Sequence, residues 1–587
     1  MRALLTALCA GFLLSCSSSE RFAETPPIVT TTGAVQAVQG GFATHKFYDI
    51  PYAKAPVGAL RWRAPQPLPA SDSLLPRLDA ELMCPQEASE VSGIEGDAIV
   101  GVEDCLYLDV YAPSQVSAAL PVMFWIHGGG NTSGRKGTYD FSRLVAEQNV
   151  VVVAINYRLG PLGWFHHPAV NGGSGAIANF GTLDIIAALG WVQQNIESFG
   201  GDAGNVTIFG ESAGGHNVFT LLASPLSEDL FHKAIAQSGY VKSMSMRQAF
   251  NQEREFEQID AGSWELAEAL GYDGDAITAD DFRSISSDLL LEVFYNIDVD
   301  HISPGIINDG IVIPTEGFAS ALNNPAYAKK GVPVMAGSNR DEVTLWLGLN
   351  RYFVDVSYPL TKLAPPKIRL KNKPVYDFWV RQRSEGWKAG GVDGPLMALE
   401  SAGYDSLYAY RYDWDEQYDI FLLKFSELFG AAHASEISFI QGAPMYGSIG
   451  SFMYPDTESA EQMTQTMMRA WGNFARTGAP GTVAGDPWPA YSAAAPHYMV
   501  LDVGDNAGLR FGATSVQTVL NAVADDSLLS PEERCILAWE LSTAINDPNY
   551  GLYHRWNNGE CADVDVRALR ESIEAALIEQ YGSASAL

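Results

Sequence analysis

Short apolar runs alternate with stretches of helical periodicity along most of the chain. The runs are rich in β-branched and aromatic residues, which predicts buried strands at 121–127, 150–156, 206–209, 332–337 and 407–412. Apolar residues recur at helical spacing in 179–198, 214–222 and 461–476. Strands that alternate with helices predict the α/β class, with a large, mostly parallel central sheet flanked by helices.

Two stretches, 240–300 and 345–400, have a more helical and irregular pattern. We expect them to be helical insertions over the carboxyl edge of the sheet, where open α/β sheets place their sites. Residues 33–525 are predicted to form the α/β domain and 526–587 a helical C-terminal extension.

The N-terminus has the pattern of an export signal. A positively charged start precedes an apolar run, 3–14, that is too short to span a bilayer. The Leu-Leu-Ser-Cys segment that ends at Cys16 resembles a bacterial lipobox. We therefore predict a lipoprotein-type signal peptide at 1–15, lipidation of Cys16 and a flexible tether at 16–32. This places the protein in the periplasm or on the outer membrane. An ordinary signal peptide, with secretion, is the alternative.

The remaining cysteines have the number expected of a disulfide framework. An even count in an exported chain predicts two disulfides, for which three pairings exist. Proximity in sequence favours Cys84–Cys105 and Cys535–Cys561. No Cys-x-x-Cys spacing or neighbouring histidine favours a metal site instead.

Composition is that of a large globular enzyme with an acidic surface. The chain has 587 residues, 47% of them hydrophobic and 18% charged, and a formal net charge of −32. Such a surface repels phosphate backbones and anionic headgroups, so nucleic acid is excluded as a partner. Membrane contact is expected only through the N-terminal lipid. The sequence carries no signal for an oligomeric state.

The segment Gly210-Glu211-Ser212-Ala213-Gly214 contains a Gly-x-Ser-x-Gly motif. The motif alone is weak, but here it directly follows a strand-like run and precedes a helical pattern. This strand–turn–helix is the context of the nucleophile elbow in the α/β-hydrolase fold, in which small neighbours permit a strained serine. We predict that Ser212 is the nucleophile.

A glycine run follows the strand predicted at 121–127. Glycines at a strand end allow backbone N–H groups to approach a substrate closely. Two such groups, with the N–H of the residue after the nucleophile, form an oxyanion hole in this fold. The predicted donors are Gly129, Gly130 and Ala213.

A serine nucleophile needs a histidine base, and the base needs an orienting carboxylate. In this fold the chain order is serine, acid, histidine. Spacing does not choose among the histidines downstream of Ser212 and its helix, which are His232, His301, His433, His497 and His554.

Ordered motifs between about residues 35 and 539 resemble the type-B carboxylesterase family, which includes cholinesterases, bacterial p-nitrobenzyl esterases and fungal lipases. They are Gly-Ala-Leu-Arg-Trp-Arg-Ala-Pro at 58–65, Glu-Asp-Cys-Leu-Tyr-Leu at 103–108, Asn-Tyr-Arg-Leu-Gly at 156–160, and the segment 195–215 that ends in Phe-Gly-Glu-Ser-Ala-Gly-Gly.

The resemblance names the other two members of a triad. Gly-Ser-Asn-Arg-Asp-Glu at 337–342 resembles the family's acid segment and implies that Glu342 is the carboxylate, with Asp341 as its neighbouring competitor. Val343 stands where the family usually has glycine. Gly-Ala-Ala-His-Ala-Ser-Glu at 430–436 implies that His433 is the base. No metal or organic cofactor is implied.

The resemblance also implies structural roles. Cys84–Cys105 corresponds to a family disulfide. Cys535 resembles a C-terminal family cysteine, whereas Cys561 lies in a tail that the family pattern does not cover. The other implied positions are the buried ion pairs Arg61–Glu103 and Arg158–Asp184, and Glu211 and Ser238 beside the triad.

The expected function is serine carboxylesterase activity on small, soluble esters through an acyl-enzyme. The loop between Cys84 and Cys105 contains no aromatic residue, so it offers no cation–π site for a choline ester. It is short and acidic, unlike the long apolar lid of a lipase. An amidase, a carbamate or toxin-ester hydrolase and a non-catalytic binding or adhesion protein are the alternatives. Trp164, Phe165 and Trp346 are either pocket or core residues.

Overall fold

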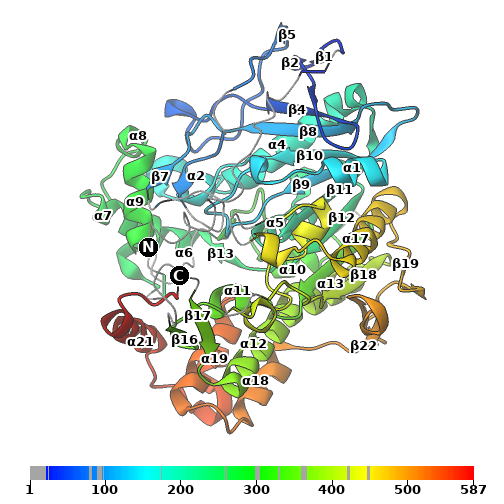
Figure 1. Ribbon diagram of the computed structural model, residues 1–587. Coiled ribbons are helices and arrows are strands. Elements are labelled where there is room, and N and C mark those ends of the chain that lie inside the picture. Colours follow the sequence, from blue (N-terminus) through cyan, green and yellow to red (C-terminus); the bar gives the residue numbers. More distant parts are fainter. Residues whose placement is uncertain are drawn as a thin grey trace.

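The computed structural model describes residues 22–586 except 24, 79–81, 89–95, 97, 174, 257, 260, 298–304, 328–330, 358–365, 420–422 and 446–449. A large twisted sheet runs through the molecule, and helices cover both of its faces (Figure 1). The predicted signal peptide and Cys16 lie outside the described residues. Within the predicted tether, residues Ile28–Thr30 form strand β1, which pairs with β2 (Thr32–Val35).

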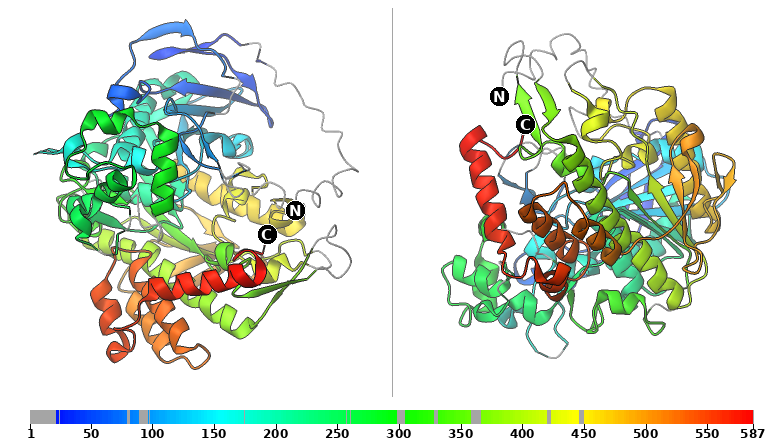
Figure 2. Two further views of the ribbon diagram at one scale, coloured as in Figure 1. Left: turned by 90° about the vertical axis from the view of Figure 1, so that its left-hand side faces the viewer. Right: turned by 90° about the horizontal axis from the view of Figure 1, so that it is seen from below.

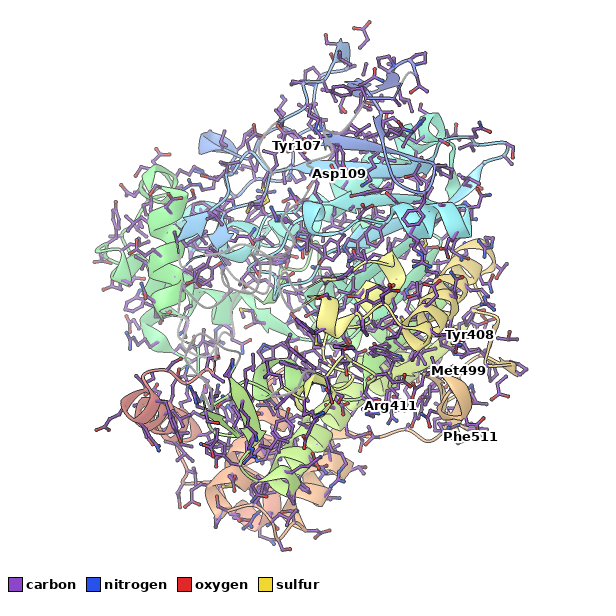
Figure 3. The ribbon with its side chains drawn as sticks, viewed as in Figure 1. Tyr107, Asp109, Tyr408, Arg411, Met499 and Phe511 are labelled. Atoms are coloured by element: carbon purple, nitrogen blue, oxygen red, sulfur yellow. A yellow bond between two sulfur atoms is a disulfide. The ribbon has the colours of Figure 1, made fainter. Side chains whose placement is uncertain are left out.

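Among the described residues the central sheet has eleven strands, and its middle is parallel. Antiparallel strands β8, β4 and β3 close one side and β22 the other (Figure 3 labels Asp109 on β8 and Phe511 on β22). In spatial order the strands are β22 (Gly508–Phe511), β21 (His497–Leu501), β18 (Leu407–Tyr412), β15 (Val334–Asn339), β12 (Lys233–Gln237), β11 (Gly201–Glu211), β9 (Leu120–Ile126), β10 (Val151–Ile155), β8 (Tyr107–Pro113), β4 (Thr44–Pro51) and β3 (Val38–Gln39).

This architecture confirms the predicted fold class. All five predicted strands are present in the parallel part of the sheet, and for four of them the boundaries agree to within two residues. The strand predicted at 206–209 extends over Gly201–Glu211. Asp202, Gly204 and Asn205 interrupt the apolar pattern in its first half, so hydrophobicity alone does not predict that part of the strand.

Strand β9 shows how the sheet divides the core. Val122, Phe124 and Ile126 pack on one face with α4 (Phe180–Asn195) and α5 (Ala213–Ala223). Met123 and Trp125 alternate with them and pack on the other face with α1 (Ser142–Gln148) and α17 (Glu458–Thr477). A strand buried on both faces has no polar side, which explains its uninterrupted apolar sequence.

The insertions and the C-terminal extension share a third hydrophobic cluster. It joins α12 (Lys373–Lys388) to α18 (Val516–Ala524), α19 (Pro531–Thr543) and α20 (Tyr550–Arg555). The final helix, α21 (Val566–Tyr581), runs along the outside of the molecule (red in Figure 2). The other helices of the insertions are α6 (Met246–Phe250), α7 (Ser263–Ala269), α8 (Ala279–Ser284), α9 (Ser287–Ile297), α11 (Thr344–Leu347) and α13 (Gly394–Ser401).

Smaller elements complete the described chain. They are α2 (Gly160–Gly163), α3 (Pro168–Asn171), α10 (Phe318–Leu322), α14 (Phe425–Leu428), α15 (Ile437–Gln441), α16 (Gly450–Met453), β5 (Ser71–Leu74), β6 (Gln86–Glu87), β7 (Ile99–Val100), β13 (Ser243–Ser245), β14 (Ile306–Asn308), β16 (Val354–Ser357), β17 (Lys367–Leu370), β19 (Thr482–Val483) and β20 (Asp486–Pro487).

Both disulfides form with the predicted pairing, Cys84–Cys105 and Cys535–Cys561. Stable disulfides are typical of proteins that fold outside the reducing cytosol, so the chain is an exported protein. The two predicted ion pairs, Arg61–Glu103 and Arg158–Asp184, are also present and largely buried. None of the helices among the described residues is both long and apolar enough to cross a bilayer.

Candidate active site

Ser212 lies at the sharp turn between β11 and α5. Its backbone has φ 56° and ψ −122°, a region that non-glycine residues rarely adopt. The Ser212 N–H donates to the Gln237 carbonyl at 2.9 Å, which fixes this turn against the next strand. A Cβ atom on Gly210 or Gly214 would collide with the backbone at Ile126. The glycines on both sides of Ser212 are therefore required by close packing against β9.

The glycine run after β9 faces Ser212 across the same cavity. Gly129 and Gly130 have φ values of 98° and 66°, and a Cβ on Gly128 would lie 3.0 Å from that of Ser212. The Gly129 carbonyl accepts hydrogen bonds from Thr132 and Ser133, which closes the turn. Among the described residues, none accepts a hydrogen bond from the N–H groups of the three predicted donors, Gly129, Gly130 and Ala213.

His433 and Glu342 are brought together from loops that follow β18 and β15. The Nδ1 atom of His433 lies 2.6 Å from Oε2 of Glu342. The other carboxylate oxygen of Glu342 accepts the Asn339 N–H at 2.7 Å, so the backbone orients the carboxylate. Both side chains are buried, and His433 lines the same cavity as Ser212.

The neighbouring carboxylate, Asp341, is directed elsewhere. It pairs with Arg340 at 2.7 Å and accepts the Ala431 N–H at 3.0 Å. Val343 adopts ordinary right-handed helical angles, φ −83° and ψ −3°, and is buried. A glycine is therefore not needed at this position for the backbone to follow its path.

Two further buried carboxylates surround the imidazole. Oε1 of Glu211 lies 3.2 Å from Nε2 of His433. Glu436 accepts hydrogen bonds from Asn339 at 2.7 Å and from Gln237 at 3.2 Å. Burial raises the pKa of Glu211 well above its ordinary range, and neighbouring carboxylates raise it further against the opposing charge of His433. Burial also raises the pKa of Glu436.

These carboxylates favour a protonated imidazole. Burial alone lowers the pKa of His433, but the charges of Glu211 and Glu342 outweigh it and raise the pKa to about 9. A cation that forms on this ring is thus stabilised by negative charge on both sides. His127, also buried nearby, shows the contrast: without a carboxylate partner its pKa falls to about 4.

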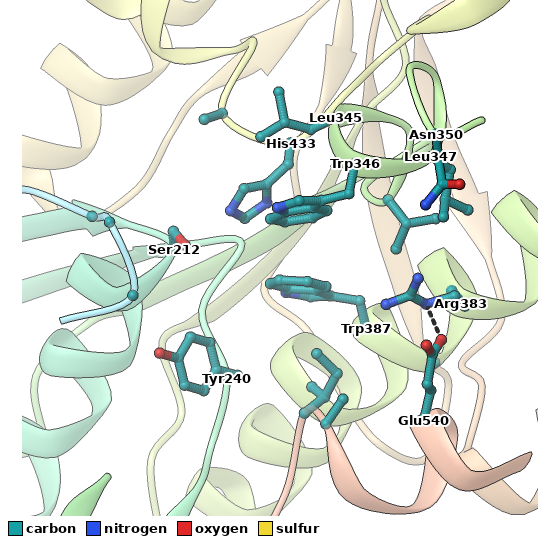
Figure 4. A pocket seen from close by; sticks show the side chains of 18 of the residues that line it. Ser212, Tyr240, Leu345, Trp346, Leu347, Asn350, Arg383, Trp387, His433 and Glu540 are labelled. Atoms are coloured by element: carbon teal, nitrogen blue, oxygen red, sulfur yellow. Dashed lines mark ion pairs between the residues drawn. The ribbon is translucent and has the colours of Figure 1, made fainter. Parts of the chain in front are cut away.

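Two tryptophans flank His433. The ring centroids of Trp346 and Trp387 lie 5.1 and 4.9 Å from the imidazole, and the two indoles are nearly parallel (Figure 4). The Trp387 N–H donates to the carbonyls of Ser238 and Gly239 at 3.1 Å, which fixes the indole beside the base. Trp346 has 49% of its surface exposed and faces the cavity.

The cavity has a volume of about 920 Å³, near the upper end of the usual range for small-molecule sites. The further lining includes Tyr240, apolar residues of α19 and α21, and charged residues such as Arg383 of α12 and Glu540 of α19. Trp164 and Phe165 do not line it; Phe165 stacks on Trp62, and both belong to the core.

Sequence reasoning missed Glu436, Trp387 and the contribution of α21. Glu436 stands within the histidine segment itself, so a carboxylate three residues after His433 was an available signal. Trp387 lies in an irregular insertion without any motif.

Ser238, which was predicted to lie beside the triad, has a buried hydroxyl and φ 46°, and its N–H donates to the Gly337 carbonyl at 2.7 Å. The described residues contain no His, Cys, Asp and Glu group suited to a metal ion.

A family model and individual relatives all relate this chain to carboxylesterases. The model of the carboxylesterase family matches residues 25–357 and 396–519. The chain is 33% identical to para-nitrobenzyl esterase of Bacillus subtilis (strain 168) over 499 residues, which cover 81% of this chain and 95% of the relative. It is 31% identical to human cocaine esterase over 577 residues, which cover 91% of this chain and 98% of that relative.

Solved structures agree. A p-nitrobenzyl (PNB) esterase matches with a TM-score of 0.65 and 28% identity, covering 83% of this chain and 97% of its own. A carboxylesterase of Geobacillus stearothermophilus matches with a TM-score of 0.64 and 27% identity, covering 83% and 98%. The chain therefore belongs to the carboxylesterase family and is a carboxylic ester hydrolase.

Proposed function

We propose that Ser212, His433 and Glu342 are the catalytic triad of this serine carboxylesterase, with Gly129, Gly130 and Ala213 as oxyanion-hole donors. The observation that carries the proposal is the 2.6 Å contact between the buried Glu342 and His433, which lines the same cavity as the strained Ser212. Gly129 and Gly130 line this cavity beside Ser212, Ala213 directly follows Ser212, and the N–H groups of the three have no acceptor among the described residues, which supports the oxyanion assignment.

In the first half-reaction, Nε2 of His433 accepts the Ser212 proton while Oγ attacks the ester carbonyl carbon. Charge that develops on the carbonyl oxygen is stabilised by the three N–H groups. The imidazolium then donates its proton to the leaving alcohol, which yields the acyl-enzyme. In the second half-reaction, Nε2 of His433 accepts a proton from water while the water oxygen attacks the acyl carbon. The imidazolium then donates this proton to Oγ of Ser212 as the acyl–oxygen bond breaks, which releases the carboxylic acid and free Ser212.

The carboxylates act through the imidazole. Glu342 holds the Nδ1 proton and so presents Nε2 to Ser212. Glu211 lies on the Nε2 side and stabilises the imidazolium by its charge. Trp387 packs beside the ring and keeps it in place. The ordinary pKa of a serine hydroxyl is far above neutrality, so this preference for imidazolium lowers the barrier to proton transfer.

We also propose that the chain is a lipoprotein anchored through Cys16 in the periplasm. The lipobox-like sequence and the two disulfides support this location. Residues 89–95 and 97 of the loop between Cys84 and Cys105 lie outside the described residues, so the absence of a lipase-like lid is a prediction from the sequence.

A series of p-nitrophenyl esters, assayed with wild type and Ser212→Ala, tests the triad. We expect the variant to lose several orders of magnitude in kcat and to resist labelling by a fluorophosphonate that labels wild type. Equal hydrolysis by both proteins would refute the assignment. A wild type that cleaves anilides faster than matched esters would favour an amidase. Absence of both hydrolysis and labelling would favour a binding protein.

A further inference from the structure

The cavity is built from two kinds of chain segment. Gly129, Ser212 and His433 lie in the ranges that match the carboxylesterase family model. Another part of the lining comes from outside those ranges: α12 lies in 358–395, and α19 and α21 lie in 520–587. The catalytic groups are thus shared with the family, whereas this part of the wall is built by segments that the family model does not match.

The residues 566–586, here called the C-terminal strap, have one apolar face. Leu569, Ile573 and Leu577 recur every four residues on α21, so they lie in one line along the helix. These side chains are half-buried, while most of their neighbours on α21 are exposed. Ile573 and Leu577 line the catalytic cavity. The apolar line of the strap therefore faces the space in which a substrate binds.

The strap is held at both ends. Before it, the Cys535–Cys561 disulfide joins the approach to α21 to α19. At its C-terminal end, the Arg351 N–H donates to the Ala584 carbonyl and the Ala586 N–H to the Leu349 carbonyl, both at 2.8 Å. Arg351 also lies over the ring of Tyr581, 5.1 Å from its centroid. The strap is thus a fixed wall rather than a loose tail.

The neighbouring helices are tied together where they meet the cavity. Arg383 of α12 pairs with Glu540 of α19 at 2.8 Å, and both line the cavity. Just after α19, the Ile545 carbonyl accepts the Val241 N–H at 3.1 Å, and Asp547 accepts the Ser243 N–H at 2.6 Å. The C-terminal extension is therefore bonded to the loop after β12, close to Tyr240 of the inner cavity.

We propose that the strap forms a distal apolar subsite that binds the part of the ester remote from the scissile bond. The inference rests on the proposed triad and names a substrate class for it: esters with an extended, mainly apolar acyl or alcohol group. A volume of about 920 Å³ exceeds the needs of a short ester, and Ile573 and Leu577 supply apolar surface where the strap lines the cavity. Arg570 and Glu574 beside them allow a polar end on such a group.

Leu577→Asp tests the subsite, with Ile578→Asp as a matched control. Ile578 is the next residue of the same helix, is 48% exposed and does not line the cavity. Two ester series are compared below their solubility limits: p-nitrophenyl acetate against octanoate, and methyl acetate against octyl acetate. In wild type we expect kcat/KM to be higher for the long ester in at least one series.

In that series, Leu577→Asp should reduce the long-to-short ratio of kcat/KM at least tenfold, with the short ester within twofold of wild type. Ile578→Asp should keep the wild-type ratio. Retained activity on the short ester shows that Leu577→Asp has folded, and Leu577→Ala provides a milder second variant that should shift the ratio in the same direction. The subsite is refuted if the wild type prefers short esters in both series, or if Leu577→Asp leaves both ratios unchanged. Inactivity of wild type on all four esters would instead contradict the triad proposal.

Discussion

The Nδ1 atom of His433 lies 2.6 Å from Oε2 of Glu342, although 91 residues separate the two in sequence. The Asn339 N–H holds the other oxygen of this carboxylate at 2.7 Å. The backbone of Asn339 thus orients Glu342, and Glu342 in turn orients His433. The predictions below test what this arrangement does.

Replacing Glu342 by glutamine should lower kcat about 10³–10⁴-fold, because an amide no longer selects the productive tautomer or stabilises the imidazolium. Steady-state kinetics on p-nitrophenyl acetate measure this. Asp341→Asn is the control, because Asp341 pairs with Arg340 and not with His433. Its kcat should stay within tenfold of wild type. A larger loss of kcat in Asp341→Asn than in Glu342→Gln would instead identify Asp341 as the triad carboxylate.

The pH profile of kcat/KM should report the raised pKa of His433. The neutral imidazole is the base, so activity is lost as pH falls through this pKa, which lies at about 9. Glu211 favours the cation, and Glu211→Gln therefore lowers the pKa of His433 and moves the acid limb to lower pH. The buried Glu265, which does not line the cavity, gives the control Glu265→Gln. An acid limb at the same pH in wild type and Glu211→Gln would exclude this electrostatic role.

Gly129→Ala should reduce kcat about 10²–10³-fold, as expected for loss of an oxyanion donor. Its φ is 98°, and a Cβ there would collide with the Ser133 carbonyl, so the turn must shift. Gly173 is a matched control, because its φ is 101° but a Cβ would meet open space. Measurements of kcat on both variants separate displacement of the glycine turn, expected only in Gly129→Ala, from backbone strain, which both variants share. Similar kcat values in the two variants would argue against an oxyanion role.

The double variant Cys535→Ser/Cys561→Ser should unfold more easily by about 3 kcal/mol, because the disulfide closes a sequence separation of 26 residues. Denaturant unfolding, followed by tryptophan fluorescence, measures this free energy. Replacing both residues avoids a free thiol. Cys84→Ser/Cys105→Ser, with a separation of 21, should lose a similar amount. An unchanged midpoint in the first variant would mean that packing alone holds the C-terminal extension.

Local patterns carried the prediction of the sheet and of Ser212. A strand such as β10, with five buried apolar residues, is visible in any short window, and Ser212 is identified by the strand and helix that adjoin it. His433 is different: its role depends on a partner 91 residues away, so only family motifs distinguished it from the other histidines. The C-terminal strap was foreseen as helical, but not as a cavity wall. Three apolar residues in a line along a mostly exposed helix do not reveal what they face.

Strand β9 contributes side chains to both hydrophobic layers, ends at Ile126, and leads through His127 into the glycine run 128–130. An in-frame deletion of one codon within it would turn every residue on one side of the deletion to the wrong face. It would also displace the glycine loop by about 3.3 Å relative to Ser212. The exposed loop 114–119, immediately upstream, has no such constraint. Natural length variation between homologous genes should therefore be found in that loop and be absent from the seven codons of β9.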